Sequence, residues 1–154
     1  MIRPTDAKHK TILLVEDSRG DIRLIQAALK EALKTTATQS EVAVVRDGVA
    51  AVAYLRREGE YAQAIPPDLI LLDLNLPKKD GREVLAEIKD DPNLKHIPVI
   101  VLTTSRDEED IWKSYGLHVN CYISKSRNLR QLFETVRGIA EFWLDTAILP
   151  PAGR

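Results

Sequence analysis

The sequence predicts an α/β fold: a doubly wound, five-stranded parallel sheet with helices on both faces. Two observations support this prediction. Short apolar runs alternate with segments of helical period, and the run at 69–72 is apolar at four consecutive positions. A strand that is apolar on both faces is typical of a parallel sheet buried between two layers of helices, and right-handed crossovers build that arrangement.

Five apolar runs are the predicted strands. They occupy residues 11–15 (TILLV), 41–45 (EVAVV), 68–72 (DLILL), 98–102 (PVIVL) and 120–124 (NCYIS). Polar residues dominate 34–41, and two prolines interrupt 65–68. Residues of these kinds favour surface connections, so both segments are predicted to link elements of the fold.

Helical periodicity marks four segments that follow these runs. In each segment, apolar residues recur three or four positions apart, which places them on one face of a helix. We expect these faces to pack against the sheet. Their members are Ile22, Ile25, Leu29 and Leu33 in the first, Val84, Leu85 and Ile88 in the second, Ile111, Trp112 and Tyr115 in the third, and Leu129, Leu132, Phe133, Val136 and Ile139 in the fourth.

The length and charge of the chain limit the classes of protein to which it can belong. Its 154 residues are enough for one domain with a buried core. A formal net charge of -1 gives no electrostatic basis for binding nucleic acid or an anionic membrane. Cys121 is the single cysteine, which excludes an internal disulfide and favours a reducing compartment. Because the sequence shows no signal peptide and no stretch long enough to span a bilayer, we expect a cytoplasmic protein.

Polar residues follow four of the predicted strands at the point where each strand ends. Glu16 and Asp17 follow the first strand and Asp73 the third; Thr103 follows the fourth and Lys125 the fifth. The carboxyl ends of parallel strands meet at one edge of the sheet, where open α/β folds bind ligands. We therefore expect these side chains to lie close together.

The chemistry of this set favours phosphoryl transfer. Three neighbouring carboxylates repel one another unless a cation or a shared proton neutralises them, and Mg²⁺ prefers oxygen ligands of this kind. The ammonium of Lys125 and the hydroxyl of Thr103 suit an anion such as phosphate. Asp73 would then be the nucleophile, since aspartate is a known acceptor of phosphoryl groups.

Each of these residues also has a structural interpretation when it is considered alone. Glu16 and Asp17 can cap the first helix, and Thr103 can satisfy backbone groups at a strand end. Lys125 can be a solvated surface charge, and Tyr122 can be a core residue. A functional site is favoured because suitable groups end several different strands at the same edge of the sheet.

Four segments carry a resemblance to a known family. The segments LLVEDS (13–18), DLILLDLNLPKKDG (68–81), IPVIVLTTS (97–105) and NCYISK (120–125) resemble the receiver domains of two-component response regulators, over residues 11 to about 139. The resemblance implies a flavodoxin-like fold with strand order 2-1-3-4-5. It also implies a phosphorelay protein that is not an enzyme beyond its own phosphorylation and autodephosphorylation.

The resemblance gives roles to the residues at the predicted sheet edge. Asp73 resembles the phosphoacceptor, and Lys125 resembles the lysine that meets the phosphoryl group. Thr103 resembles the hydroxyl residue that assists catalysis and forms a switch with the aromatic Tyr122. The Mg²⁺ ligands would be Glu16, Asp17, Asp73 and the backbone carbonyl of Asn75, and the residues that tune dephosphorylation would be Asn75, Thr104 and Ser105.

Two positions depart from the usual receiver pattern. Ser126 follows Lys125 where most receivers have a proline in a cis peptide, which leaves the shape of the last loop open. Glu16 stands where aspartate is more usual. These departures, together with segments 57–85, 102–111 and 142–151, resemble one subgroup, the small regulators paired with cyanobacterial phytochromes. The implied partner is a sensor histidine kinase of the phytochrome class.

Two other functions compete with the receiver interpretation. The first is a phosphatase of the haloacid-dehalogenase type, which also uses a strand-end aspartate and Mg²⁺. Such an enzyme needs an acid/base aspartate two residues after the nucleophile, and this chain has Asn75 there. The second is a binding module that has the receiver fold but is not phosphorylated. The presence of Asp73, Thr103 and Lys125 argues against it.

The chain is predicted to comprise an N-terminal tail (1–10), a receiver domain with an extended fifth helix (11–145) and a C-terminal tail (146–154). Large apolar residues follow the predicted fifth helix, and they cannot all face inward. We expect a homodimer through the fourth helix, the fifth strand, the fifth helix and the tail. In the alternative, the tail folds back over the edge of its own domain. The dimer residues would be Phe142, Trp143, Leu144, Ile148 and Leu149.

Overall fold

The sheet has the predicted topology. The computed structural model describes residues 9–34 and 36–151, and the five strands in these ranges are parallel, in the order β2-β1-β3-β4-β5. The predicted α/β class and the strand order are therefore confirmed. The strands are β1 (His9–Val15), β2 (Gln39–Val45), β3 (Leu69–Leu72), β4 (Val99–Thr103) and β5 (Cys121–Ser124).

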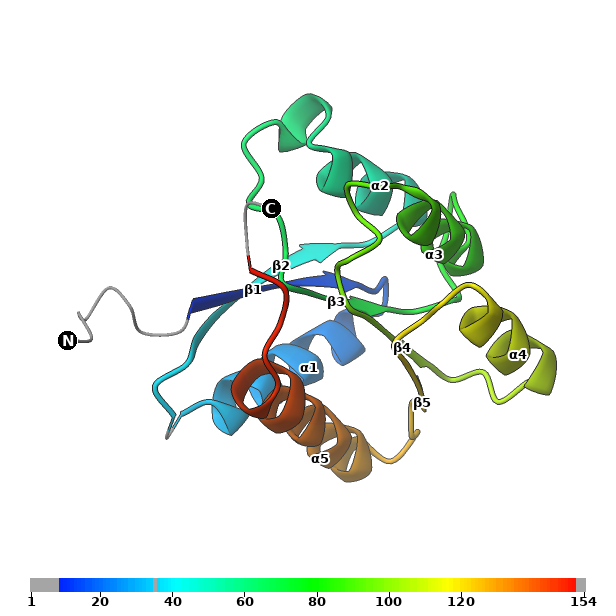
Figure 1. Cartoon of the computed structure of the whole chain (residues 1–154). Helices are drawn as coiled ribbons and strands as arrows, with labels where there is room; N and C mark the ends of the chain where they lie inside the picture. The colour runs from blue at the N-terminus through cyan, green and yellow to red at the C-terminus, as the bar shows by residue number, and fades with distance from the viewer. Residues whose placement is uncertain (1–8, 35, 152–154) are drawn as a thin grey trace.

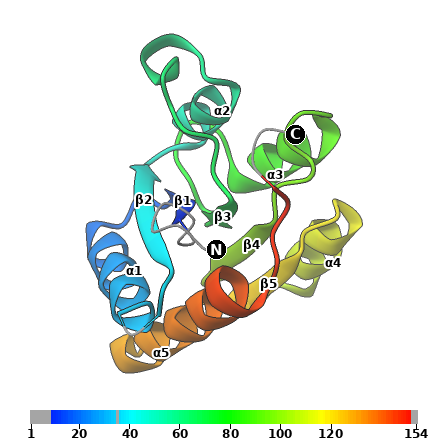
Figure 2. The same ribbon diagram turned by 60° about the vertical axis from the view of Figure 1, so that its left-hand side comes forward.

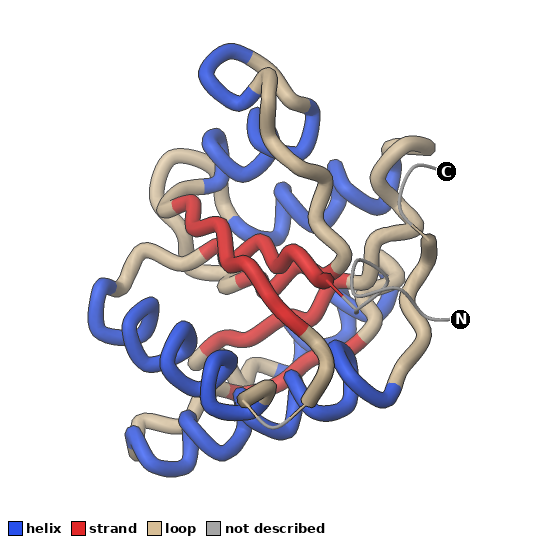
Figure 3. The backbone as a smooth tube through the Cα atoms, turned by 90° about the vertical axis from the view of Figure 1, so that its left-hand side faces the viewer, coloured by secondary structure: helices blue, strands red, loops and turns tan. Residues whose placement is uncertain are grey.

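Helices cover the sheet in two layers (Figure 1). On one face, α1 (Arg19–Ala32) and α5 (Leu129–Ile139) lie side by side, as Figure 2 also shows. On the other face lie α2 (Gly48–Arg56), α3 (Gly81–Asp90) and α4 (Glu108–Gly116). Figure 3 shows the strands enclosed between these layers, which confirms the doubly wound arrangement. No helix among the described residues has the length and apolar character needed to cross a membrane.

The helices begin at side-chain caps close to the carboxyl edge of the sheet. Ser18 accepts a hydrogen bond from the backbone N–H of Asp21 at the start of α1, and Asp80 accepts one from Arg82 at the start of α3. Asp47, Asp107 and Asn128 cap α2, α4 and α5 in the same way. Each cap satisfies a backbone donor that has no partner within the helix. The caps thereby fix the loops that carry the polar residues of this edge.

The sheet separates two hydrophobic cores. Successive side chains of a strand point to opposite faces, so Leu13 and Val15 of β1 join the core under α2 and α3. Ile12 and Leu14 join the core under α1 and α5. Both faces of β1 and β3 are therefore buried, which explains why these strands are continuous apolar runs.

Gly81 allows α3 to begin directly against the loop that follows β3. A Cβ atom at this position would lie 2.3 Å from the carbonyl oxygen of Asp73 and 2.5 Å from the Cα of Leu74. Both are backbone atoms, which cannot move aside as a flexible side chain could. The glycine therefore lets α3 pack closely on the backbone that carries Asp73.

The predicted strand boundaries differ from the structure by one or two residues, and one helix was not predicted. β1 and β2 each start two residues earlier than predicted, at His9 and Gln39, because these residues pair with each other in the parallel ladder. The polar segment 34–41 is therefore partly strand. Periodicity does not mark α2, because its sequence GVAAVAYLR lacks the polar stripe that gives a surface helix its contrast.

The predicted inward faces of two helices are partly wrong. Trp112 and Tyr115 of α4 are 79% and 49% exposed, and Ser114 is the buried residue of this helix. Leu129, the first residue of α5, is 65% exposed. The two aromatic residues are three positions apart and share a face, but the neighbouring face of α4 is the one that meets the sheet.

The helix continues beyond α5 as η3 (Ala140–Thr146), a π-helical segment. Leu144 is 1% exposed and packs in the core under α1 and α5, and Leu149 is 6% exposed. The prediction that these two leucines belong to an exposed dimer patch is therefore wrong in this structure, because they pack on their own chain. Phe142 and Ile148 are 53% and 99% exposed, and Trp143 is half-buried.

The last described residues fold back across the amino edge of the sheet. Pro150 and Pro151 line a cavity of about 230 Å³ together with Pro66, Pro67 and Pro98, which precede β3 and β4. Figure 1 shows this segment (red) running from the end of α5 toward the loop before β3. The alternative in which the tail covers its own domain describes this part of the chain. Residues 1–8 and 152–154 of the two predicted tails lie outside the described residues.

Candidate functional site

The carboxyl edge of the sheet gathers four buried polar residues. Glu16 follows β1, Asp73 follows β3, Thr103 ends β4 and Lys125 follows β5. Their exposed fractions lie between 0% and 6%. Burial of charged groups is costly unless they are paired and hydrogen-bonded, so their contacts with one another hold this edge together.

Lys125 lies at the centre of the cluster. Its Nζ donates hydrogen bonds of 2.6 Å to Oε1 of Glu16, 2.8 Å to Oδ2 of Asp21 and 3.0 Å to Oδ2 of Asp73. An ammonium has three donors, and all three are used here. Burial disfavours the charged form, but the hydrogen bonds to Asp21 and Glu16 outweigh it and raise the pKa of Lys125 above its ordinary value.

Asp21 was not among the residues predicted from the sequence. It lies in the first turn of α1, where an acidic residue is ordinarily explained by the helix dipole. The available signal is positional: α1 begins directly after the Glu16–Asp17 turn, so its first turn faces the sheet edge. Asp21 therefore adds a third carboxylate to the contacts of Lys125.

Glu16 is engaged at both carboxylate oxygens. Oε1 accepts from Lys125, and Oε2 accepts from the backbone N–H groups of Asp17 and Ser18 at 3.0 and 3.1 Å. Burial raises the pKa of Glu16 to about 7; the hydrogen bond from Lys125 acts in the opposite direction, and the charge of Asp73 adds to the rise. Glu16 thus fixes both the β1–α1 turn and the lysine.

Asp73 is held at both oxygens by residues of other strands and of its own loop. Oδ1 accepts from the hydroxyl of Thr103 at 2.9 Å and from the backbone N–H of Asn75 at 3.0 Å, and Oδ2 accepts from Lys125. Hydrogen bonds of this kind fix the orientation of the carboxylate. The side chains of Asn75 and Thr104 are exposed beside the loops that meet here.

The predicted metal ligands are only partly gathered in this structure. Asp17 is exposed, and its carbonyl accepts a hydrogen bond from Arg46. Within residues 9–34 and 36–151, no three side chains of the metal-ligating types are grouped to hold an ion. The donor set still fits a hard divalent cation, because Asp17, Asp73 and the Asn75 carbonyl all offer oxygen, and Mg²⁺ keeps several waters and needs few protein ligands.

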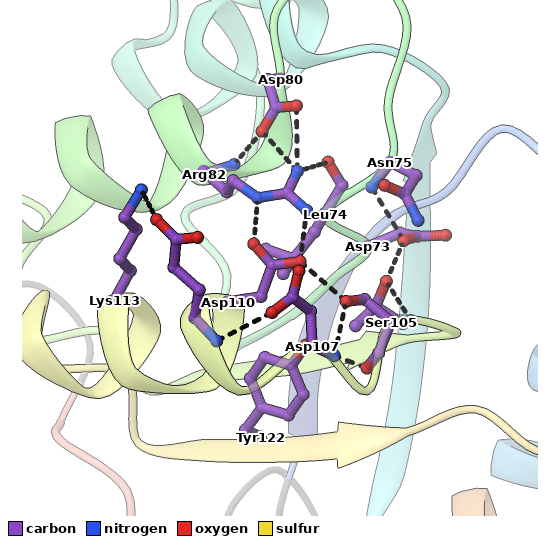
Figure 4. Close-up of polar contacts among 12 residues, drawn as sticks. Asp73, Leu74, Asn75, Asp80, Arg82, Ser105, Asp107, Asp110, Lys113 and Tyr122 are labelled. Carbon is purple, nitrogen blue, oxygen red and sulfur yellow. Dashed lines mark hydrogen bonds and ion pairs between the residues drawn. The ribbon is translucent and has the colours of Figure 1, made fainter.

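The two predicted switch residues are linked through the loop after β4, and Figure 4 shows Ser105 and Tyr122 of this connection. Thr103 turns its hydroxyl toward Asp73, and its Oγ1 lies 3.5 Å from the backbone nitrogen of Ser105. The hydroxyl of Tyr122 donates to the carbonyl of Ser105 at 3.0 Å. Tyr122 is half-buried and packs against the core under α2 and α3. Ser105 therefore contacts both predicted switch residues.

The loop after Lys125 takes its shape from Ser126. Among the described residues every peptide bond is trans, including the one that joins these two residues. The hydroxyl of Ser126 donates to Oε1 of Gln131 at 2.7 Å and accepts from the backbone N–H of Asn128 at 3.1 Å. Side-chain hydrogen bonds thus hold the loop where most receivers have proline.

The fold and the site together define the class of protein. A sheet of order 2-1-3-4-5 presents a buried aspartate between a threonine hydroxyl and a lysine ammonium. The family model described as "Response regulator receiver domain" matches residues 12–137. The chain belongs to the response regulator receiver family, and this membership replaces the phosphatase alternative.

Within this family, the chain is most informatively compared with three similar proteins and structures. The chain is 61% identical over 143 residues to the response regulator Rcp1 of Synechocystis sp., a match that covers 93% of this chain and 95% of Rcp1. The crystal structure of the phosphorylated cyanobacterial phytochrome response regulator RcpA has a TM-score of 0.88 and 68% identity over 93% of this chain and 99% of that one. The Mn²⁺-bound form of Rcp1 has a TM-score of 0.85 and 60% identity over 92% and 99%. The predicted resemblance to phytochrome-associated regulators is confirmed.

Proposed function

We propose that this chain accepts a phosphoryl group on Asp73 from a sensor histidine kinase of the phytochrome class. The observation that carries the proposal is the buried carboxylate of Asp73, held between Thr103 and Lys125 at 2.9 and 3.0 Å. The phytochrome class is supported by the similarity to RcpA and Rcp1. The free thiol of Cys121 suits a reducing compartment such as the cytoplasm, which is the proposed location.

In the proposed reaction, a carboxylate oxygen of Asp73 attacks the phosphorus of the phosphohistidine. An O–P bond forms while the N–P bond breaks, and the imidazole leaves with the electron pair and takes up a proton. Lys125 neutralises charge on the phosphoryl oxygens, and Thr103 donates a hydrogen bond to one of them. Both groups already touch Asp73, so little reorganisation is needed.

A divalent cation, proposed to be Mg²⁺, would be held by Asp17, Asp73 and the Asn75 carbonyl, with Glu16 beside it. When bound, it would neutralise charge on the transferring oxygens as a Lewis acid. The Mn²⁺-bound form of Rcp1 supports a divalent ion in a relative of this chain. The chain's own task is to keep these oxygens at the sheet edge, and the bonds of Glu16 to the β1–α1 turn serve that purpose.

Thr103 and Tyr122 are proposed to report phosphorylation to the surface. The hydroxyl of Thr103, which contacts Asp73 in this structure, would instead donate its hydrogen bond to the phosphoryl group. The loop after β4 would move together with Thr103. Tyr122 binds that loop at Ser105, so its position would change with it. Thr104 and Ser105 flank the acceptor with Asn75, and they are proposed to tune hydrolysis by controlling the access of water.

A homodimer through α4, β5, α5 and the tail is the proposed assembly. Trp112 and Tyr115 on α4 and Phe142 and Ile148 beyond α5 are large exposed apolar residues. Phe142 and Trp143 form an edge-to-face pair with ring centroids 5.4 Å apart. Exposed aromatic residues on a globular protein commonly mark interfaces. The buried Leu144 and Leu149 take no part in this revised patch.

The test is labelling by acetyl phosphate with Mg²⁺, in the wild type and in Asp73→Asn. Stable stoichiometric labelling that disappears in the variant, as an acid-stable and base-labile acyl phosphate, is the expected result. Absence of labelling in the wild type would favour an unphosphorylated binding module. Transfer from a phytochrome kinase, measured beside transfer from an unrelated histidine kinase, tests the proposed partner.

A further inference from the structure

Arg82 and Asp110 form an ion pair between α3 and α4 that the proposed phosphorylation chemistry does not use. Nε of Arg82 donates to Oδ1 of Asp110 at 2.7 Å, and Nη2 donates to Oδ2 at 2.6 Å. Nη1 of Arg82 donates to both oxygens of Asp80 at 3.0 Å. The guanidinium therefore binds one carboxylate in the paired, planar geometry that makes such contacts strong.

This pair differs from an ordinary surface ion pair. The side chains of Arg82 and Asp110 are 33% and 14% exposed. On the same helix, the exposed pair Lys113–Glu109 has side chains that are 63% and 69% exposed. Exposed pairs contribute little, whereas partial burial and two parallel bonds fix one geometry. The hydrogen bond from Arg82 outweighs the effect of burial and lowers the pKa of Asp110 to about 2, so Asp110 is charged at neutral pH.

Ser105 connects the ion pair to Tyr122, one of the two predicted switch residues. The hydroxyl of Ser105 donates to Oδ2 of Asp110 at 2.7 Å, and the carbonyl of Ser105 accepts from the hydroxyl of Tyr122 at 3.0 Å. Figure 4 shows these side chains converging between α3, α4 and β5. Asp110 thus fixes the side chain of the residue whose backbone holds Tyr122.

We propose that Arg82 and Asp110 are positioning residues that act through Ser105 to hold Tyr122 in its half-buried place. Without the ion pair, the loop after β4 loses its tie to α3, and the carbonyl of Ser105 is no longer fixed where Tyr122 can reach it. Arg82 and Asp110 would then set how strongly the position of Tyr122 depends on events at Asp73. The regulatory role rests on the proposed function, but the positioning of Tyr122 does not.

The experiment follows Tyr122 directly, by ¹⁹F NMR of protein labelled with 3-fluorotyrosine. The chain has four tyrosines, and the signal of Tyr122 is the one lost in Tyr122→Phe. In Arg82→Gln and Asp110→Asn we expect this signal to move toward the value of the unfolded chain. Glu109→Gln is the matched control for Asp110→Asn, because it removes the same negative charge one residue away and breaks the exposed pair with Lys113.

Labelling of Asp73 by acetyl phosphate separates the two proposals. We expect Arg82→Gln and Asp110→Asn to be labelled like the wild type, because neither residue contacts the acceptor. Ser105→Ala adds a variant that keeps the ion pair and removes the hydroxyl that joins it to the loop. It also removes the 3.3 Å hydrogen bond that this hydroxyl accepts from the backbone N–H of Asp107, and it should move the Tyr122 signal in the same direction. The proposal is overturned if the Tyr122 signal stays in place in Ser105→Ala, or if the ion-pair variants match Glu109→Gln. If the wild type is not labelled at all, the proposed function fails while the NMR result still stands.

Discussion

Lys125 and Asp21 are joined by a 2.8 Å ion pair that ties the loop after β5 to the first turn of α1. The lysine side chain is 4% exposed and that of Asp21 is 27% exposed. A buried ammonium needs every partner it has, because unpaired donors in a site of low polarity are costly. Asp21 is therefore expected to contribute to the stability of the protein as well as to the charge of its site.

The first prediction concerns this pair. Asp21→Asn should lower the free energy of unfolding by about 1 kcal/mol, because it weakens one charged hydrogen bond of a buried lysine. Urea denaturation in the presence of a metal chelator measures the change. Asp17→Asn makes the same charge change on an exposed residue of the preceding turn and should have little effect. Equal stability of the two variants would contradict the role of Asp21.

The second prediction concerns acid. The pKa of Asp110 is about 2 in the folded protein, against an ordinary value of 3.8. The charged carboxylate therefore stabilises the fold at pH values above 3.8, and this contribution is lost as the pH falls through about 2. The loss of stability caused by Asp110→Asn should have its full size at pH 7 and at pH 5, and it should become smaller between pH 4 and pH 2. Urea denaturation of both proteins across this range checks it, with Glu109→Gln as the control. A difference that does not depend on pH would show that charge is not the cause.

The third prediction concerns the close contact at Gly81. Gly81→Ala should destabilise the protein by about 1–3 kcal/mol, because its Cβ would clash with the backbone at Asp73 and Leu74. It should also slow the labelling of Asp73, because the acceptor loop must shift. Gly138→Ala is the matched control: outside its own helix backbone, no atom lies within 4 Å of the place its Cβ would take, and it should stabilise α5 by about 0.5–1 kcal/mol. A fully labelled and stable Gly81→Ala would disprove the close packing.

The fourth prediction concerns assembly. Replacing Phe142 and Ile148 together by serine should leave the fold intact, since both side chains are exposed, and should convert a dimer to a monomer. Sedimentation at micromolar concentration, with and without phosphorylation, measures the mass. Val49→Ser is the control, because Val49 is 51% exposed on α2, which lies on the opposite face of the sheet from α5. If wild type and variant sediment alike, the patch is not the interface.

The residues at the strand ends could be predicted because strand direction and apolar period are local properties of the sequence. Asp73, Thr103 and Lys125 each end or follow an apolar run, so their meeting at one edge follows from a parallel sheet. Asp21 and Arg82 could not be found in this way. They lie on helices, and the contacts of their long or polar side chains depend on how the helices pack on the sheet.

The surface of the fold was also harder to predict than its core. The aromatic pair Trp112 and Tyr115 shows helical spacing but faces outward. Leu144 and Leu149 follow a helix that already covers the sheet, yet both side chains are buried against their own chain. Periodicity identifies an apolar face but not the surface on which it packs, whether that surface is the same domain or a partner.

The tail covers the amino ends of the strands, and the candidate functional site lies at their carboxyl ends. Glu16, Asp73 and Lys125 lie at one end of the strands, while Pro150 and Pro151 close the other beside the prolines that precede β3 and β4. The tail starts from the α1–α5 layer and ends against the loop that leaves α2. It therefore connects the two helical layers at the amino ends of the strands. A change in the tail therefore leaves every described contact of Asp73 in place.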